Sequence, residues 1–311
     1  MNCTLCGDRA VILIREEQLS LCKQHLIQRI LDYSRTVLEM IKPGGTSIRI
    51  AVATSGGKDS TVCLHILHSL LEEYALDIIA IAVDEGIEGF RNIKLHRLKK
   101  FAQNLGVDLN VVSFKEFFGA SLDEMVKLSL GKGFMYKPCT ICGVLRRYLL
   151  NKTARELGVE YLATGHNMDD EAQSILMNIL KNNIDKIARS APITAIKHKK
   201  FIPRLKPLYY CTEKEVMTYA LIQHFEIPVV DCPYLFFNER RILRRWLNKV
   251  EYLRPGTKKR LISLKNRISL NSQREPTKRV KLCTKCGEPS SEDICKTCQI
   301  LEYLEINMDG G

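Results

Sequence analysis

The sequence predicts an α/β protein built on a parallel sheet, and three observations support that prediction. Short apolar, β-branched runs alternate with stretches of helical periodicity, a glycine-rich loop follows the first run, and a Gly-His pair follows the last. The expected strands are 48–53, 78–83, 109–112 and 161–164, and the expected helices are 60–73, 92–105, 145–157 and 169–180. Ligands of such a sheet gather at the carboxyl ends of the strands, where Ser55, Asp84 and His166 should emerge.

The composition is that of an ordinary soluble protein. The 311 residues are 45% hydrophobic and 26% charged, and no apolar stretch approaches the ~20 residues that span a bilayer. Cys3 and Cys6 stand where a secretory leader would have a basic region and an apolar run. We therefore expect a cytoplasmic protein without a membrane partner.

The loop after the first strand is the strongest single motif. It has the sequence Ser55-Gly56-Gly57-Lys58-Asp59-Ser60 and leads into a predicted helix. Paired glycines let backbone N–H groups converge on an anion, the helix adds its positive dipole end, and Lys58 adds a mobile charge. The spacing of the glycines and the lysine differs from that in the phosphate loops of ordinary kinases and GTPases. It resembles the pyrophosphatase loop of ATP-dependent adenylating enzymes, so ATP is the expected ligand.

Positive charge concentrates in one segment. Residues 239–281 contain fifteen Lys or Arg against three acids, and the difference of twelve equals the net charge of the chain. Such a segment suits a polyanion, because neutralised phosphates release counterions. Apolar residues at helical spacing predict an amphipathic helix packed on the protein: Ile242, Leu243, Trp246, Leu247 and Val250. RNA is the favoured partner, and a solvated basic helix pair is the alternative.

Seven of the twelve cysteines and one histidine form two sets with metal-ligand spacing. The first set is Cys3, Cys6, Cys22 and His25, and the second is Cys283, Cys286, Cys295 and Cys298. Each set can surround one Zn²⁺ tetrahedrally and leaves no open position, so both zinc sites should be structural. The alternative for His25 is a surface residue at the start of a helix.

A third group of cysteines is incomplete. Cys139-x-x-Cys142 supplies two thiolates, and Cys232 is a possible third. An incomplete thiolate cage leaves an open position for substrate or sulfur, as catalysis requires. A redox-active disulfide and a pair of buried structural cysteines are the alternatives. Cys63 and Cys211 are expected to be small core residues.

Three carboxylates follow the last predicted strand. Asp169, Asp170 and Glu171 begin a helix after Gly165-His166-Asn167. Acidic residues stabilise a helix N-terminus, so capping alone explains Asp169 and Glu171. A carboxylate beside a triphosphate can also hold Mg²⁺, which neutralises a leaving pyrophosphate. We expect Asp170 to be the catalytic member.

These motifs together resemble the tRNA 2-thiolation family, and more narrowly the cytosolic tRNA-thiouridine synthetases of archaea and eukaryotes. The resemblance runs nearly end to end. The segments that carry it are Ser55 to Ser60, Val83-Asp84-Glu85-Gly86-Ile87, Cys139 to Arg147, Thr164 to Glu171, and Cys232.

The resemblance implies an adenine-nucleotide α-hydrolase (PP-loop) fold and a set of site residues. ATP would contact Ala53, Thr54, Ser55, Gly56, Gly57, Lys58, Asp59, Ser60, Val83, Gly165 and Asp170. Cys139, Cys142 and Cys232 match the cysteines that hold a 4Fe-4S cluster in family members, and with Lys58 and Asp170 they would be catalytic. The implied division is a zinc module at 1–30, the PP-loop domain at 31–235, a basic tRNA-binding segment at 236–281 and a zinc ribbon at 282–311.

The implied activity is ATP-dependent synthesis of 2-thiouridine in tRNA. The C2 oxygen of uridine would be adenylated and then replaced by sulfur, either at an iron-sulfur site or through a persulfide pair of Cys142 and Cys232. Some relatives have lysine where Arg146 and Arg147 stand here, which favours the wobble uridine, position 34, over the T-loop uridine, position 54. The run 197–200 and the zinc modules would help to grip tRNA.

Partners and rival functions follow from the same residues. Free sulfide or a thiocarboxylated ubiquitin-like carrier would supply sulfur, and the resemblance implies a homodimer. One alternative is an adenylating tRNA enzyme with an amine nucleophile, which has no use for the three cysteines. Another is a noncatalytic zinc-containing RNA-binding subunit.

Overall fold

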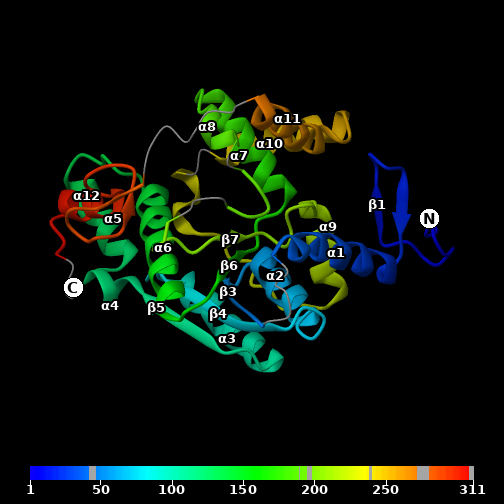
Figure 1. Ribbon diagram of the computed structural model, residues 1–311, viewed down its shortest axis with the longest axis horizontal. Coiled ribbons are helices and arrows are strands. Elements are labelled where there is room, and N and C mark those ends of the chain that lie inside the picture. The colour runs from blue at the N-terminus through cyan, green and yellow to red at the C-terminus, as the bar shows by residue number, and fades with distance from the viewer. Residues whose placement is uncertain (42–46, 189, 195–197, 238–239, 272–279, 308–311) are drawn as a thin grey trace.

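A five-stranded parallel sheet lies at the centre of the computed structural model (Figure 1), which describes residues 1–41, 47–188, 190–194, 198–237, 240–271 and 280–307. The strand order is β5-β4-β3-β6-β7, and each pairing is parallel. The strands are β3 (Ile48–Ala53), β4 (Leu76–Asp84), β5 (Leu109–Ser113), β6 (Tyr161–Thr164) and β7 (Arg204–Leu205). The predicted α/β class and parallel sheet are therefore confirmed.

Helices cover both faces of this sheet because the strands are apolar on both sides. In β3, Ile48, Ile50 and Val52 belong to one core, while Ala51 belongs to the other. The first core includes α1 (Lys23–Leu38), α2 (Lys58–Ser69), α7 (Met168–Leu180) and α9 (Glu213–Ile222). The second includes α4 (Phe114–Phe118), α5 (Leu122–Gly131), α6 (Pro138–Glu156) and α12 (Lys296–Leu304). Ala82 of β4 packs with α3 (Arg91–Leu105).

The sheet has a switch point between β3 and β6. The chain runs outward from β3 through β4 to β5, and then crosses back to place β6 on the other side of β3. Ala53 and Thr164, the last residues of these two strands, are register partners. In open parallel sheets this is where a crevice forms at the carboxyl ends of the strands. The glycine-rich loop and Gly165 therefore emerge side by side.

Helix α6 is longer than the sequence pattern predicts. It begins at Pro138, seven residues before the expected start at 145. Proline suits the first helical position, because the N–H group that it lacks would have no intrahelical partner there. The expected start was therefore wrong, and Cys139 and Cys142 lie on the first turns of a helix.

Two small modules lie at opposite ends of the long axis (Figure 1). The N-terminal one contains the hairpin of β1 (Ile12–Ile14) and β2 (Leu19–Leu21), followed by α1 and the short helix η1 (Glu39–Ile41). The C-terminal one contains β8 (Lys281–Leu282), β9 (Pro289–Ser290) and α12. Among the described ranges, no helix is both long and apolar enough to span a bilayer.

The basic segment forms two helices, α10 (Arg240–Leu253) and α11 (Thr257–Asn271), which lie beside α7 and α8 (Ile184–Ala188) (Figure 1). The short helix η2 (Pro233–Phe237) precedes them. The expected packing of α10 is only partly right. Leu247 is fully buried and Leu243 and Val250 are partly buried, but Ile242 is 73% exposed and Trp246 is 53% exposed, so part of the apolar side of this helix faces solvent. The predictions that involve 197, 238–239, 272–279 and 308–311 lie outside the described residues.

Candidate active site

The glycine-rich loop is organised by its own serines. The backbone N–H groups of Ser55 and Gly57 donate to the hydroxyls of Ser60 and Ser55, at 3.1 Å and 3.3 Å. The Ser60 hydroxyl in turn donates to the Gly57 carbonyl at 3.0 Å. Gly57 caps the N-terminus of α2, so the loop is folded over the positive end of a helix dipole. The arrangement can receive an anion.

Two glycines allow close backbone approaches around this loop. A Cβ on Gly56, whose φ is +72°, would lie 2.8 Å from the carbonyl oxygen of Lys94. A Cβ on Gly165 would lie 2.6 Å from the backbone carbonyl of Asp59 and 2.7 Å from the backbone nitrogen of Ser60. The strand end after β6 therefore touches the loop after β3 so closely that only glycine fits.

The residues expected to contact adenosine end the same strands. Ala53 is the last residue of β3, and the buried Thr54 donates from its backbone and its hydroxyl to the carbonyl of Ile81. Val83 lies one residue before the end of β4 and is buried. Their part in nucleotide binding remains a prediction. His166 follows β6 as expected, and burial followed by the charge of Lys206 lowers its pKa to about 4, which keeps the imidazole neutral.

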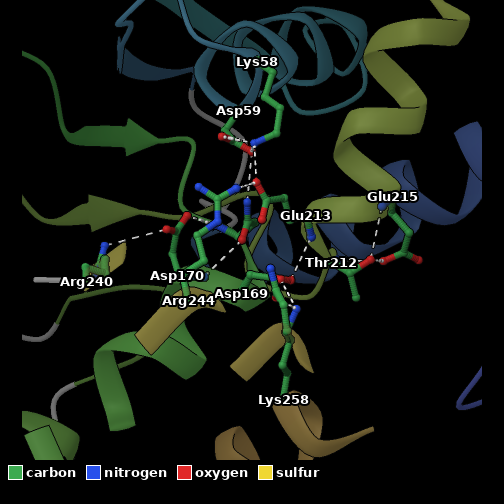
Figure 2. Close-up of polar contacts among 12 residues, drawn as sticks. Lys58, Asp59, Asp169, Asp170, Thr212, Glu213, Glu215, Arg240, Arg244 and Lys258 are labelled. Atoms are coloured by element: carbon green, nitrogen blue, oxygen red, sulfur yellow. Dashed lines mark hydrogen bonds and ion pairs between the residues drawn. The ribbon is translucent and has the colours of Figure 1, made fainter. Parts of the chain in front are cut away.

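The three carboxylates at the start of α7 have different partners, and Figure 2 shows those of Asp169 and Asp170. Asp169 accepts from the backbone N–H of Glu213 at 2.9 Å and forms an ion pair with Lys258. Glu171 binds Lys206 at 2.6 Å. Asp170 forms a capping box with Asn167 and lies 3.7 Å from Arg240. All three therefore contribute to local structure.

Asp170 differs from the other two in its protonation. Burial raises the pKa of Asp170 to about 6, Arg240 opposes the shift, and the like charges of Asp59 and Glu213 add to it. A carboxylate that is desolvated beside other carboxylates gains from a nearby cation. Asp170 and Asp59 therefore fit a site for Mg²⁺.

Lys58 lies among carboxylates (Figure 2). Its ammonium group is 2.9 Å from both Asp59 and Glu213. Burial lowers the pKa of Lys58, but the two carboxylates outweigh burial and the pKa is raised overall, so the amine stays charged. Asp59 is itself fixed by the amide of Asn167 at 3.0 Å. The loop after β3 and the loop after β6 thus meet at Lys58 and Asp59.

A buried ion pair connects the loop to the cysteine region. Arg91 donates to the carbonyl of Ser55 at 2.7 Å and lies 3.0 Å from Glu85, which follows β4. Both side chains are less than 6% exposed. Arg146 also reaches Glu85, at 3.4 Å, and its charge opposes the rise in the pKa of Cys142. Charged groups therefore continue from the phosphate loop to Cys142.

The three cysteines of the incomplete group come from α6 and from the segment before η2. Cys142 and Cys232 pack against the same hydrophobic core, and Cys139 contacts the carbonyl oxygen of Tyr234. Burial is the main cause that raises the pKa of each thiol, to about 12 for Cys142, and a charge on Cys232 would raise the pKa of the other two further. The structure therefore brings residues 139–142 and 232 together. Among the described residues, the three are not one of the groups whose ligand atoms all lie within 4.8 Å of one another, and their role as cluster ligands stays a prediction.

Both terminal sets of metal-ligand candidates are assembled. In each set all four ligand atoms lie within 4.8 Å of one another. In the first set Cys22 Sγ is 3.2 Å from His25 Nδ1 and 3.7 Å from Cys6 Sγ. In the second, Cys283 Sγ is 3.7 Å from Cys298 Sγ. Tetrahedral thiolate sites have such separations, so each set could hold one metal ion. Cys63 and Cys211 are fully buried core residues, as expected.

Comparison with known proteins agrees with this geometry. Residues 30–227 match the family model of the PP-loop domain. The chain is 35% identical over 308 residues to Cytoplasmic tRNA 2-thiolation protein 1 of Xenopus laevis, which covers 98% of this chain and 88% of that protein. The chain belongs to this tRNA 2-thiolation family. A family member named probable sulfurtransferase, from Methanocaldococcus jannaschii, is 36% identical over 306 residues, 96% of this chain and 87% of its own length.

A solved structure resembles the chain over nearly its whole length. It is described as the U34-tRNA thiolase NcsA from Methanococcus maripaludis with its 4Fe-4S cluster. The TM-score is 0.80 at 30% identity, and the match covers 98% of this chain and 96% of that one. The family fold therefore extends beyond the PP-loop domain to both terminal modules.

Sequence reasoning missed several residues around the loop of this family member. Glu213 binds Lys58, and two cations of the basic segment, Arg244 and Lys258, reach Glu213 and Asp169. The only signal was the pattern from Thr212 to Glu215, a capping box that starts α9. That pattern predicts where the helix begins but not which loop it faces.

Proposed function

We propose that this protein is an ATP-dependent tRNA sulfurtransferase that makes 2-thiouridine at the wobble position. The observation that carries the proposal is the convergence at one edge of the sheet of a phosphate-binding loop, an acid with a raised pKa, and a group of three cysteines. An enzyme that only ligates an amine needs the first two features but not the third.

Activation of the base comes first in this proposal. The C2 oxygen of uridine attacks the α-phosphorus of ATP, an O–P bond forms, and pyrophosphate leaves. Lys58 and the N-terminus of α2 stabilise the charge that develops on the pyrophosphate. Asp170 and Asp59 would hold Mg²⁺, which adds further positive charge.

Replacement of oxygen by sulfur follows. A sulfur nucleophile attacks C2, and AMP leaves with the original oxygen. Cys139, Cys142 and Cys232 are the residues that would hold a 4Fe-4S cluster, which when bound supplies a site that presents sulfur. Three cysteine ligands would leave one iron of such a cluster without a protein thiolate, and Arg146 supplies positive charge beside Cys142.

The basic helices provide the surface for tRNA. α10 carries Arg240 and Arg244 directly over the loop, and exposed Trp246 can stack on an unpaired base. The anticodon loop already exposes its bases, which reduces the cost of bringing one to the strand ends. Arg146 and Arg147, where some relatives have lysine, favour the wobble uridine.

Further assignments follow from the same reasoning. The two terminal sets would each hold one structural Zn²⁺, because their four ligands leave no open position. Free sulfide or a thiocarboxylated ubiquitin-like protein would supply sulfur. The protein would act in the cytoplasm as a homodimer.

The decisive experiment is mass spectrometry of nucleosides from tRNA incubated without oxygen with the protein, ATP and sulfide. We expect 2-thiouridine that maps to position 34 and requires ATP. Cys142→Ser should abolish the product and leave ATP binding intact, while Cys63→Ala, a change at a core cysteine, should retain it. Thiolation that survives replacement of all three cysteines would refute the mechanism, and a product with nitrogen at C2 would indicate the amine-transfer class.

A further inference from the structure

Glu213 receives two cations from different parts of the chain (Figure 2). Its Oε1 atom is 2.9 Å from the ammonium group of Lys58 and forms an ion pair with Arg244. Lys58 comes from the phosphate loop, whereas Arg244 comes from α10 in the basic segment. The side chains of Lys58 and Glu213 are 19% and 18% exposed, whereas that of Arg244 is 51% exposed, so the junction is shielded on the side of the phosphate loop and open to solvent on the side of α10.

The charges at this junction indicate that Glu213 occupies the place of an anionic ligand. Burial raises the pKa of Glu213, but Lys58, Arg244 and Lys258 together outweigh burial and lower it, so the carboxylate is ionised. Lys58 is the lysine that should bind the terminal phosphates of a nucleotide. A carboxylate that holds this lysine and an arginine reproduces two of the contacts a phosphate group would make.

Helix α10 is held in place over the loop at several points. Arg240, one turn before Arg244, lies 3.7 Å from Asp170. Lys258, near the start of α11, forms an ion pair with Asp169 and lies 2.7 Å from Asn248 of α10. The position of Arg244 beside Lys58 therefore does not depend on a single contact.

Neighbouring arginines of the same helix behave differently. Arg241 and Arg245 are exposed, and no hydrogen bond or ion pair connects them to any residue in the described part of the chain. Arg244 and Arg245 are adjacent in sequence but point about 100° apart around the helix. Proximity to the phosphate loop is thus specific to one face of α10.

We propose that Arg244 is a second cation for the β- and γ-phosphates of ATP, and that Glu213 holds it beside Lys58 until the nucleotide arrives. The inference rests on the proposed function, because it assumes that ATP binds the loop. On binding, the terminal phosphates replace the carboxylate of Glu213 as the partner of both cations. The basic helix that faces tRNA thereby becomes part of the nucleotide site.

Two substitutions should change ATP affinity in opposite directions. Arg244→Gln removes a phosphate contact and weakens binding. Glu213→Gln removes the competing anion and the repulsion that it exerts on bound phosphates, so it strengthens binding. If Glu213 served only to position Lys58, its loss would instead weaken binding, because the lysine would no longer be held in place.

Isothermal titration of the full-length protein, without tRNA, tests the proposal. We expect Arg244→Gln to raise the Kd for MgATP and for magnesium pyrophosphate about tenfold, and to leave the Kd for AMP unchanged. Arg245→Gln is the matched control and should leave all three values unchanged. Glu213→Gln should lower the Kd for MgATP severalfold. Thermal unfolding confirms that each variant is folded.

The results distinguish failure of this inference from failure of the proposed function. Equal MgATP affinities for Arg244→Gln and Arg245→Gln would overturn the role of Arg244, and weaker binding by Glu213→Gln would overturn the role of Glu213 as a stand-in for phosphate, while ATP binding stands in both cases. Failure of the unaltered protein to bind MgATP would overturn the proposed function and this inference with it.

Discussion

Replacing Gly165 by alanine tests whether the meeting of the two strand ends sets ATP affinity. The new Cβ would lie 2.6 Å from the carbonyl of Asp59 and 2.7 Å from the nitrogen of Ser60. Ordinary van der Waals contact begins at 3.4 Å, so the atoms must separate by about 0.8 Å, the difference between 3.4 Å and 2.6 Å. The neighbours are backbone atoms at the start of α2 and cannot rotate away. The phosphate loop itself must move.

The expected cost has two parts. Overpacking of this kind destabilises a protein by about 1–3 kcal/mol. A displacement of roughly 1 Å in a positioning element can reduce function by about a hundredfold, so we expect ATP affinity to fall at least tenfold. Urea unfolding gives the first quantity, and isothermal titration with MgATP gives the second.

A second glycine provides the control. A Cβ on Gly131, the last residue of α5, would meet no other atom within 4 Å in the described part of the chain. Gly131→Ala should therefore leave ATP affinity unchanged and raise stability slightly, because alanine favours a helix. If the Kd of Gly165→Ala protein for MgATP is within twofold of that of the unaltered protein, the close approach at Gly165 does not position the loop.

Three further predictions concern charge and metal binding. Because the raised pKa of Asp170 means that the folded state binds its proton more tightly, the unaltered protein should lose stability from pH 4 to above pH 6. Asp170→Asn protein lacks this loss. In urea unfolding without Mg²⁺, its free energy of unfolding minus that of the unaltered protein should be higher at pH 7 than at pH 4 by roughly 2 kcal/mol. A difference that does not change with pH would contradict this. Glu288→Gln removes the negative charge that Arg155 binds at 3.0 Å and should speed hydrogen exchange in α12, whereas unchanged exchange would show that the ion pair does not hold the ribbon. In elemental analysis, Cys22→Ser protein should contain one zinc equivalent in place of two, and Cys63→Ala protein should contain both. Two equivalents in Cys22→Ser protein would exclude a zinc site at Cys3, Cys6, Cys22 and His25.

The strands were the most predictable part of the fold. β3 and β6 have the predicted bounds, because each is a short apolar run that ends at a polar or glycine-containing turn. β7 has two residues, too few to give a pattern. The start of α6 was missed because Thr140, Ile141 and Gly143 weaken the helical signal of that turn. Tertiary packing, with Ile141 fully buried, overrides that weak propensity.

The candidate site was predictable only where its residues are neighbours in sequence. The phosphate loop and the terminal ligand sets are local motifs, and the spacing of their residues reflects their chemistry. The contact between Lys58 and Glu213 joins residues 155 positions apart, and Arg244 reaches Glu213 across 31. No periodicity encodes which charged helix crosses which loop, because that depends on the packing of α9 against α2 and of α10 against α7.

The C-terminal ribbon is not an independent appendage. Ile300, Leu301 and Leu304 of α12 are buried in the same core as Leu145 and Leu149 of α6. Since α6 also carries Cys139 and Cys142, the last helix of the chain supports the scaffold beneath them. A truncated protein that ends near residue 281 would expose this apolar surface and lose the support beneath Cys139 and Cys142, the cysteines proposed to be catalytic. If the ribbon holds the proposed zinc ion, a chelator that removes it should likewise abolish the proposed activity without touching the three cysteines.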